Sequence, residues 1–501
     1  MISWHGFVLA ALSGAGLLAA SACGRPFETA GAGGSPTGSS SGMGASSTSS
    51  GGGGSCSGLP LQDGATVDGC GVFVSATGSA SGDGSIDRPY RTLQEGVDNA
   101  NGRPVYACGD FIEAVDVSTP LVLYGGFDCS GGAPWTYATA GRSKLGTLDS
   151  KVPFVVHGAA KSVEVHSFAI SAVAAAAAGS SAIAVAIDDG VSASFADCDV
   201  SAGSGRPGKD AAPPEGHGTD GSDAKDLQGM PNDACHGATP SAGAGGTLQC
   251  DDGPTKGGDG GPGGALANAS TSAGPAQRGS PFDGPGDGEA GNAGTPGAAC
   301  TGGHTGKAGK RGAPGAGGKD TVLGLGTISG GDGQPGKPGA RGHGGGGGGG
   351  ANGGQICGMA FPYTPGVGAS GGGGGSGGCG GAGAPGSTAG GSSIAFLVLG
   401  DALALHGVKI KVGDGGKGGD GAPGQPGGAA GHGADGGQRG GVGQSACPGG
   451  EGGQGGDGGA SGGARGGHAV GIAFAKTPKS APSASFEGGD AGPGGAAGGA
   501  T

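Results

Sequence analysis

The chain is poor in the residues that build large cores and in those that bind polyanions. Aromatic residues make up 4% of its 501 residues, too few for one hydrophobic core over the whole length. Lys and Arg number 26 against 39 Asp and Glu, so there is no basic excess for nucleic acid or an anionic membrane. No apolar run reaches 18 residues, which excludes a transmembrane helix, and no CxxC occurs, which argues against zinc ribbons and thioredoxin-like sites.

Glycine dominates what is present. The 138 glycines and 31 prolines together exceed a third of the chain, a composition of low-complexity or fibrous polymers rather than of one globule. Because glycine loses the most backbone freedom on ordering, the chain is expected to divide into a compact part and a glycine-rich part.

The N-terminus reads as an export signal. An apolar run over 7–19 is followed by small residues and Cys23, and this resembles a bacterial lipoprotein signal, although no Lys or Arg precedes the run. The resemblance implies a lipid on Cys23 and a membrane partner through that lipid, at the outer membrane or cell surface. The alternative is an ordinary signal peptide cleaved nearby. Residues 1–22 are then the signal and 23–57 a Gly/Ser-rich tether.

Much of the chain's aromatic and β-branched content lies between residues 71 and 129. Apolar, β-branched stretches over 71–75, 103–108, 113–117 and 120–125 predict strands, and residues 90–100 predict a short amphipathic helix with Leu93, Val97 and Ala100 on one face. This order resembles the N-terminal end of right-handed parallel β-helix proteins of the pectate-lyase-like superfamily. The matching residues are Val72, Val74, Ser75, Pro89, Thr92, Leu93, Gln94, Val97, Ala100, Val105, Tyr106, Gly109, Phe111, Glu113, Val115, Leu121, Leu123, Tyr124 and Gly125. The resemblance implies a fold and brings no catalytic residue.

Three later segments share one apolar spacing. Residues 163–170, 193–200 and 403–410 each place apolar residues at positions 1, 3, 6 and 8, which is the pattern of a strand, a two-residue corner and a second strand. Residues 181–187, 392–398 and 468–474 align in the same way. We therefore predict an all-β fold, a small right-handed parallel β-helix with its N-terminal cap and first coils over 58–203, a further coil over 392–412 and a last one over 468–487.

The remaining segments, 204–391, 413–467 and 488–501, are glycine-rich excursions from one corner of this solenoid. Their glycine register breaks too often for collagen, the large aliphatic residue of a calcium-binding nonapeptide repeat is missing, and Ala308 replaces the Ser or Thr of a P-loop after Lys307. Two states stay open, and disorder or loose polyproline II is favoured over packed polyglycine-II-like helices. The composition of these segments resembles that of glycine-rich PGRS-type proteins of actinobacteria and myxobacteria.

Twelve cysteines suit an exported, disulfide-bonded chain. Cys108 with Cys129 and Cys56 with Cys70 are the candidate pairs near the cap. Cys198 falls on an inward position and reads as a buried thiol. Six further cysteines lie in the glycine-rich segments, and disulfide bonds between them would order these segments.

The sequence offers few candidate catalytic or metal-binding residues. Asp188, Asp189, Asp197 and Asp199 are the candidate carboxylates, with Asp197 and Asp199 expected on the outer surface, where paired carboxylates serve acid–base chemistry or calcium binding. The matching positions in the next coil are Gly407 and Lys409, so no carboxylate ladder forms. We expect a non-enzymatic structural, adhesive or matrix-contacting envelope protein without cofactors, with extracellular polysaccharide or surface proteins as partners. The alternative is a carbohydrate-binding or polysaccharide-processing β-helix protein.

Overall fold

The computed structural model describes residues 70–131, 135–138, 140–225, 233–236, 241–266, 271–357, 365–441 and 443–499. Contacts divide the chain into Met1–Gly54 and Ser55–Thr501, and every described residue belongs to the second unit. The predicted signal, the tether, Cys23 and Cys56 all lie outside the described residues.

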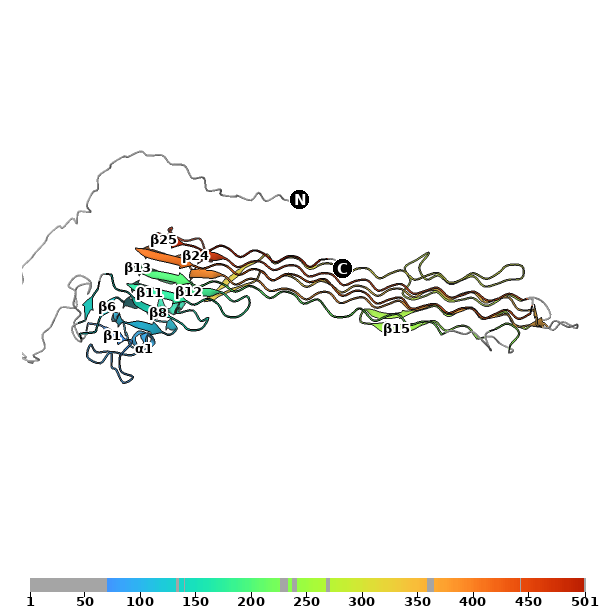
Figure 1. The fold of residues 1–501 in the computed structure, drawn as a ribbon, viewed down its shortest axis with the longest axis horizontal. Coiled ribbons are helices and arrows are strands. Elements are labelled where there is room, and N and C mark those ends of the chain that lie inside the picture. The colour runs from blue at the N-terminus through green and yellow to red at the C-terminus, as the bar shows by residue number, and fades with distance from the viewer. Residues whose placement is uncertain are drawn as a thin grey trace, which may run out of the picture. The chain divides into compact units, whose positions relative to one another are not determined.

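Three parallel sheets carry most of the strands (Figure 1). Sheet one contains, in spatial order, β1 (Val72–Ser75), β2 (Val105–Cys108), β5 (Leu121–Tyr124), β10 (Ser162–His166), β13 (Ser192–Ala196) and β22 (Leu403–His406). Sheet two contains β3 (Asp110–Ile112), β8 (Ser143–Gly146), β11 (Phe168–Ala172), β14 (Asp199–Ala202), β23 (Val408–Val412) and β25 (Ala484–Glu487). Sheet three contains β4 (Val115–Val117), β9 (Phe154–Val156), β12 (Ala182–Ile187), β21 (Ser393–Val398) and β24 (Ala469–Phe474). The expected all-β class with parallel sheets is thus observed.

The strand registers confirm the alignment of the three repeated segments. In sheet one Val165 pairs with Phe195, and Phe195 pairs with Leu405, although 210 residues separate the last two. In sheet two Ile170, Val200 and Ile410 are paired in the same way. Sheet three aligns β12, β21 and β24 in the predicted offset. Parallel pairing over such distances is possible because the cost of closing a loop rises only slowly with its length.

The inward side chains of the sheets form one apolar core. All twelve residues at the predicted inward positions belong to it, and each is at most 4% exposed. The corner between sheets one and two turns through left-handed backbone at Ser167, Asp197 and Gly407, with φ of 58°, 51° and 64°. Two features favour glycine at position 407. Its φ is in the left-handed region, and a Cβ built there would lie 2.7 Å from Oδ1 of Asp197.

The predicted amphipathic helix is α1 (Leu93–Asp98), and it packs against β1, β2 and β4. Thr92 and Glu95 form a capping box, which satisfies the first free N–H groups of the helix. The carboxylate of Glu113 accepts hydrogen bonds from the N–H groups of Leu93 at 2.8 Å and Gln94 at 3.2 Å. Leu93 and Val97 are buried, as predicted, so the helix covers the core near the first strands. A short 3-10 helix, η1 (Gly158–Ala160), follows β9.

The outer face of sheet one is also covered near its start. Phe73, Tyr106 and Tyr124 pack with Phe127 and Trp135 in a second apolar cluster. The hairpin of β6 (Phe127–Asp128) and β7 (Thr136–Tyr137) belongs to this cover, and the disulfide between Cys108 and Cys129 ties it to β2. That disulfide is one of the two pairs predicted near the cap.

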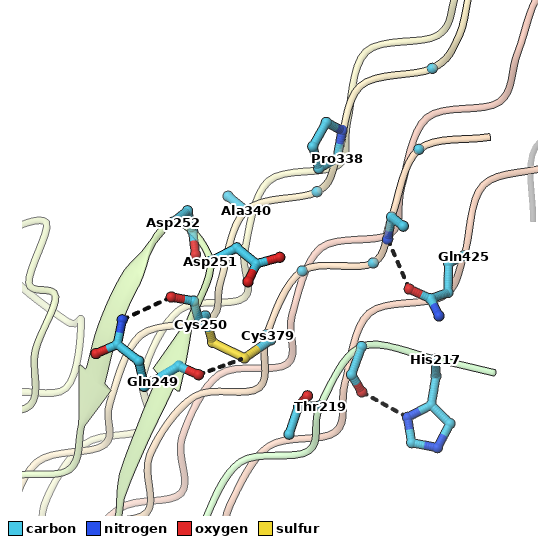
Figure 2. Close-up of a pocket in the computed structure, with 17 residues that line it drawn as sticks. His217, Thr219, Gln249, Cys250, Asp251, Asp252, Pro338, Ala340, Cys379 and Gln425 are labelled. Atoms are coloured by element: carbon cyan, nitrogen blue, oxygen red, sulfur yellow. Dashed lines mark hydrogen bonds between the residues drawn. A yellow bond between two sulfur atoms is a disulfide. The ribbon is translucent and has the colours of Figure 1, made fainter. Parts of the chain in front are cut away.

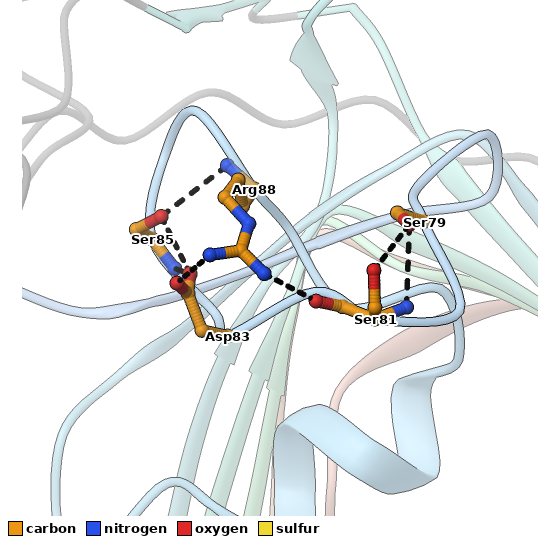
Figure 3. A network of polar contacts seen from close by, with 5 residues as sticks. All are labelled: Ser79, Ser81, Asp83, Ser85 and Arg88. Carbon is orange, nitrogen blue, oxygen red and sulfur yellow. Dashed lines mark hydrogen bonds and ion pairs between the residues drawn. The ribbon is translucent and has the colours of Figure 1, made fainter.

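A loop over 79–88 reaches the same cluster through Ile86. Polar contacts order this loop (Figure 3): the guanidinium of Arg88 lies 3.1 Å from the carboxylate of Asp83 and donates to the carbonyl of Ser81 at 2.7 Å. Asp83 also accepts the hydroxyl of Ser85 at 2.7 Å. These contacts hold the loop in one conformation.

The glycine-rich segments run side by side (Figure 1), and their backbones are hydrogen-bonded to one another. The N–H groups of Gly336, Gly339, Gly342 and Gly345 bond the carbonyls of Ala384, Gly381, Gly378 and Gly375, in steps of three residues on both strands. The expectation of largely disordered excursions is therefore wrong for the described residues. Three short hairpins lie within these segments: β15 (Thr247–Cys250) with β16 (Gly253–Lys256), β17 (Val322–Gly324) with β18 (Thr327–Ser329), and β19 (Gln355–Ile356) with β20 (Pro365–Gly366).

These segments leave from sheet two and return to sheet three, as the sequence predicts. The first runs from the end of β14 to the start of β21, and the second from the end of β23 to the start of β24. The outgoing segments keep the spacing of sheet two, because Gly205 and Gly208 donate to the carbonyls of Asp414 and Lys417. The segments that follow β14 and β23 therefore stay neighbours in the glycine-rich array, as the two strands are in sheet two.

Candidate functional site

The run of seven glycines at 344–350 lies inside the glycine-rich array, and all seven are buried. Three successive residues meet three different neighbours. A Cβ built on Gly345, Gly346 or Gly347 would lie 2.2 Å from the carbonyl oxygen of Gly450, 1.8 Å from that of Glu289 or 2.1 Å from that of Asp259. In each case the hydrogen that replaces the Cβ points at a carbonyl, a contact worth about 0.5–1 kcal/mol. This segment is therefore enclosed by backbone on each of its three faces.

Segments nearer the surface need fewer glycines. Between 306 and 318 a glycine recurs every third residue, and the intervening residues include Lys307, Lys310 and Arg311. Between 449 and 467 most triplets contain two glycines. The third residue of a triplet can be exposed, as Glu451 and Gln454 are. The number of glycines per triplet thus reports how many faces of a segment touch a neighbouring backbone.

Aspartates satisfy backbone N–H groups along the array. The carboxylate of Asp210 accepts the N–H of Asp420 at 2.7 Å, and the carboxylate of Asp420 accepts the N–H of Ala496 at 2.8 Å. The same contact joins Asp220 to Ala429, Asp223 to His432 and Asp414 to Asp490. Part of the chain's net acidity therefore has a structural role, since charge-assisted bonds of this kind are stronger than neutral ones.

Three disulfides link the six cysteines of the glycine-rich segments. The pairs are Cys235–Cys357, Cys250–Cys379 and Cys300–Cys447, with sequence separations of 122, 129 and 147 residues. Cross-links that close loops of this length stabilise a fold by about 4–5 kcal/mol each in the chain-entropy account. The sequence left open whether these six cysteines are paired, and all six form disulfides.

Cys198 is the one free cysteine among the described residues, and it is buried. Burial raises the pKa of its thiol to about 12, so the thiolate is absent at neutral pH. The prediction that Cys198 is a buried thiol is confirmed. Cys70 lies at the start of the described residues, but its predicted partner Cys56 lies outside them.

The candidate carboxylates Asp197 and Asp199 lie on the outer surface, as predicted. Asp197 is exposed at the left-handed corner, and Asp199 is half-buried in β14. Asp199 pairs in register with Lys409, and Asp197 lies over Gly407. The structure thus places no carboxylate beneath either residue in the adjoining strand, and the two residues stay no more than candidates for acid–base chemistry or calcium binding.

A charged corner follows sheet three. It gathers Asp188 and Asp189, the other two candidate carboxylates, with side chains from the neighbouring turns. The contacts are Asp116 with Nε2 of His157 at 3.0 Å, Asp188 with the N–H of Gly158 at 3.0 Å, Asp189 with Nζ of Lys476 at 2.5 Å, and Asp401 with Nζ of Lys479 at 3.0 Å. Each carboxylate of this corner already has a partner, and such exposed ion pairs contribute about 0–1 kcal/mol.

One carboxylate is fully buried in the glycine-rich array. Asp287 is 0% exposed, and its oxygens accept Nδ1–H of His343 at 2.6 Å and the N–H groups of Asp283 at 2.6 Å and Lys307 at 2.8 Å. Burial by itself raises the pKa of this carboxyl, but the N–H of Lys307, the ring of His343 and the N–H of Asp283 outweigh it and hold the pKa below its ordinary value. Sequence reasoning missed this pair, because Asp287 and His343 are 56 residues apart.

Substituting Asp287→Asn is expected to lower the stability of the array at pH 7 by about 1–3 kcal/mol, because one amide nitrogen replaces an acceptor and faces N–H donors. A carboxyl whose pKa is depressed by folding stabilises above its unfolded pKa, about 3.9, and loses that contribution as pH falls through the folded pKa. The difference between wild type and variant, measured by urea unfolding, should therefore shrink between pH 7 and pH 3. Equal stability at pH 7 would contradict this role.

A surface groove of about 840 Å³ opens where the hairpin of β15 and β16 ends (Figure 2). Two antiparallel glycine-rich strands, 336–340 and 379–383, line it together with His217, Thr219 and Gln425. The turn residues Asp251 and Asp252 lie at one end, beside the disulfide between Cys250 and Cys379. Asp252 is held there by the N–H of Arg341 at 3.0 Å.

No known protein family, curated protein or solved structure matches the chain. Within the described ranges, no helix has the length and apolar character that crossing a membrane requires. Across the same residues, no three His, Cys, Asp or Glu side chains are grouped to hold a metal ion.

Proposed function

We propose that the protein is an exported, lipid-anchored structural or adhesive protein of the cell envelope, in which a small right-handed parallel β-helix carries a polyglycine-II-like array. From β2 to β24 the strands of the three sheets pass to sheets one, two and three in rotation and share one core, which supports the β-helix assignment. The right hand follows the general preference of parallel crossover connections.

The observation that carries the proposal is the cross-linked order of the glycine-rich segments. Backbone bonds recur at every third residue, and three disulfides join segments more than a hundred residues apart. Such bonds persist in oxidising compartments outside the cytoplasm, which supports export. An array of this kind fixes the spacing of its outward side chains, which suits contact with a matrix or another surface.

The alternative, a carbohydrate-binding or polysaccharide-processing β-helix protein, needs two or more carboxylates and a basic residue facing one groove. The charged corner pairs Asp189 with Lys476 and Asp401 with Lys479, while Asp188 accepts the N–H of Gly158. Their mutual pairing favours a stabilising role over an acid–base role, because the lysines neutralise the carboxylates that a reaction would use.

The anchor is tested with a Cys23→Ser variant. Because lipidation and the cleavage linked to it need this thiol, the variant is expected to leave the membrane fraction, whereas wild type stays in it. Protease treatment of whole cells should remove the wild-type protein if it faces outward. Unchanged membrane partitioning of the variant would sink the anchor, and a matched Cys198→Ser variant should partition as wild type does.

A further inference from the structure

We propose that the groove beside the β15–β16 hairpin binds an extended peptide with glycine at every third residue, supplied in trans by another polypeptide. The proposal goes beyond the envelope role and does not depend on where the protein is located. It rests on one fact: the chain's own segment 256–264 already fills the continuation of the same channel.

The bonds of that segment define the channel. The N–H groups of Gly258, Gly261 and Gly264 donate to the carbonyls of Gly345, Gly348 and Ala351 on one wall. The carbonyls of the same three residues accept the N–H groups of Gly374, Gly371 and Gly368 on the other wall. The walls are antiparallel, so each step of three residues along one wall moves three residues back along the other.

The same walls continue past the hairpin, and within the part of the chain that the structure describes no segment lies between them there. At Thr255 a side chain replaces the backbone on one wall, because its Oγ1, in place of a carbonyl, accepts the N–H of Gly377 at 2.9 Å. The next positions on the walls are the carbonyls of Gly339 and Gly336 and the N–H groups of Gly380 and Gly383. Among the described residues these four groups meet no hydrogen-bonding partner, although the walls remain joined through Gly336 to Ala384 and Gly339 to Gly381.

The channel also sets the sequence of its occupant. A Cβ on Gly257, Gly260 or Gly263 would lie 1.8, 2.0 or 1.9 Å from a wall carbonyl, so the residue before each bonding residue must be glycine. The bonding residue must keep its N–H. The third position accepts either Asp259 or Pro262 in the chain itself. A Gly-Gly-Pro repeat therefore meets all three requirements, and proline holds it in the extended polyproline II form.

The test uses the full-length oxidised protein and fluorescent nonapeptides in an anisotropy titration. The (Gly-Gly-Pro)₃ peptide should bind. The (Gly-Pro-Pro)₃ peptide lacks the N–H of the bonding residue, and (Ala-Gly-Pro)₃ cannot place glycine before a bonding residue that keeps its N–H. Both should bind at least about tenfold more weakly, because each loses backbone bonds or clashes with the wall.

A pair of variants locates the binding. Ala382 lines the groove and is exposed, so Ala382→Tyr is expected to fill the groove and abolish binding of (Gly-Gly-Pro)₃ while circular dichroism stays unchanged. Ala313→Tyr is the matched control, since Ala313 is exposed on a similar segment outside the groove, and it should bind as wild type does. Equal binding of the three peptides, or full binding by Ala382→Tyr, would overturn the proposal. Concentration-dependent dimers in sedimentation that Ala382→Tyr abolishes would also overturn it, by assigning the groove to a second copy of the chain.

Discussion

Replacing Gly346 by alanine is expected to destabilise the glycine-rich array by about 3 kcal/mol, the upper end of ordinary overpacking. The new methyl group would lie 1.8 Å from the carbonyl oxygen of Glu289 and 2.4 Å from its carbon. Both are backbone atoms, so no side chain can rotate away. Either the segment carrying Glu289 moves, or the bonds of Gly346 to the carbonyl of His304 and from the N–H of Gly450 break.

Gly317→Ala is the matched control for this substitution. The nearest atom to a Cβ on Gly317 is the carbonyl oxygen of Gly463 at 3.5 Å, an ordinary contact. This variant should be as stable as wild type or gain about 0.4–1 kcal/mol from a less flexible unfolded chain. Hydrogen exchange of the amides in 344–350 separates the two variants, because fast exchange is expected only in Gly346→Ala. Equal protection in both would show that the glycine run is not packed on three faces.

The sequence predicts the sheets well because their core has a side-chain signal. The apolar spacing of 163–170, 193–200 and 403–410 identifies the paired strands even across the long excursion, and the registers agree with it. A one-residue shift would turn Phe195 and Val200 outward, so the burial of one face fixes the pairing. The excursions also begin and end where the strand pattern stops.

The order of the glycine-rich segments is harder to predict, because their contacts involve backbone atoms alone. Composition measures the lack of apolar side chains and so favours disorder. A usable signal was present in the triplets: one glycine in three near Lys307, two in three near Glu451, and a continuous run at 344–350. This gradient follows the number of enclosed faces. The partners of each segment, and the groove left by the short hairpin, depend on which segments become neighbours, which the sequence pattern does not specify.

Replacing Phe195 by alanine is expected to destabilise the sheets by about 3–5 kcal/mol, the usual result of removing a buried aromatic ring. Phe195 is 0% exposed, and its ring centre lies 5.0 Å from that of Phe396 and 6.3 Å from that of Phe154, both edge-on. The three rings belong to strands of sheets one and three, so a cavity here removes contacts between sheets as well as within one.

Phe486→Ala removes the same ring from the surface of β25, where Phe486 is 58% exposed, and should change stability by no more than about 1 kcal/mol. The two variants are compared by hydrogen exchange of β13 and β21, which reports the sheets separately from the glycine-rich array. Faster exchange is expected only in Phe195→Ala. If both variants exchanged alike, the stability of the sheets would not depend on the aromatic column at their centre, and the long-range pairing of β13 with β22 would need another source.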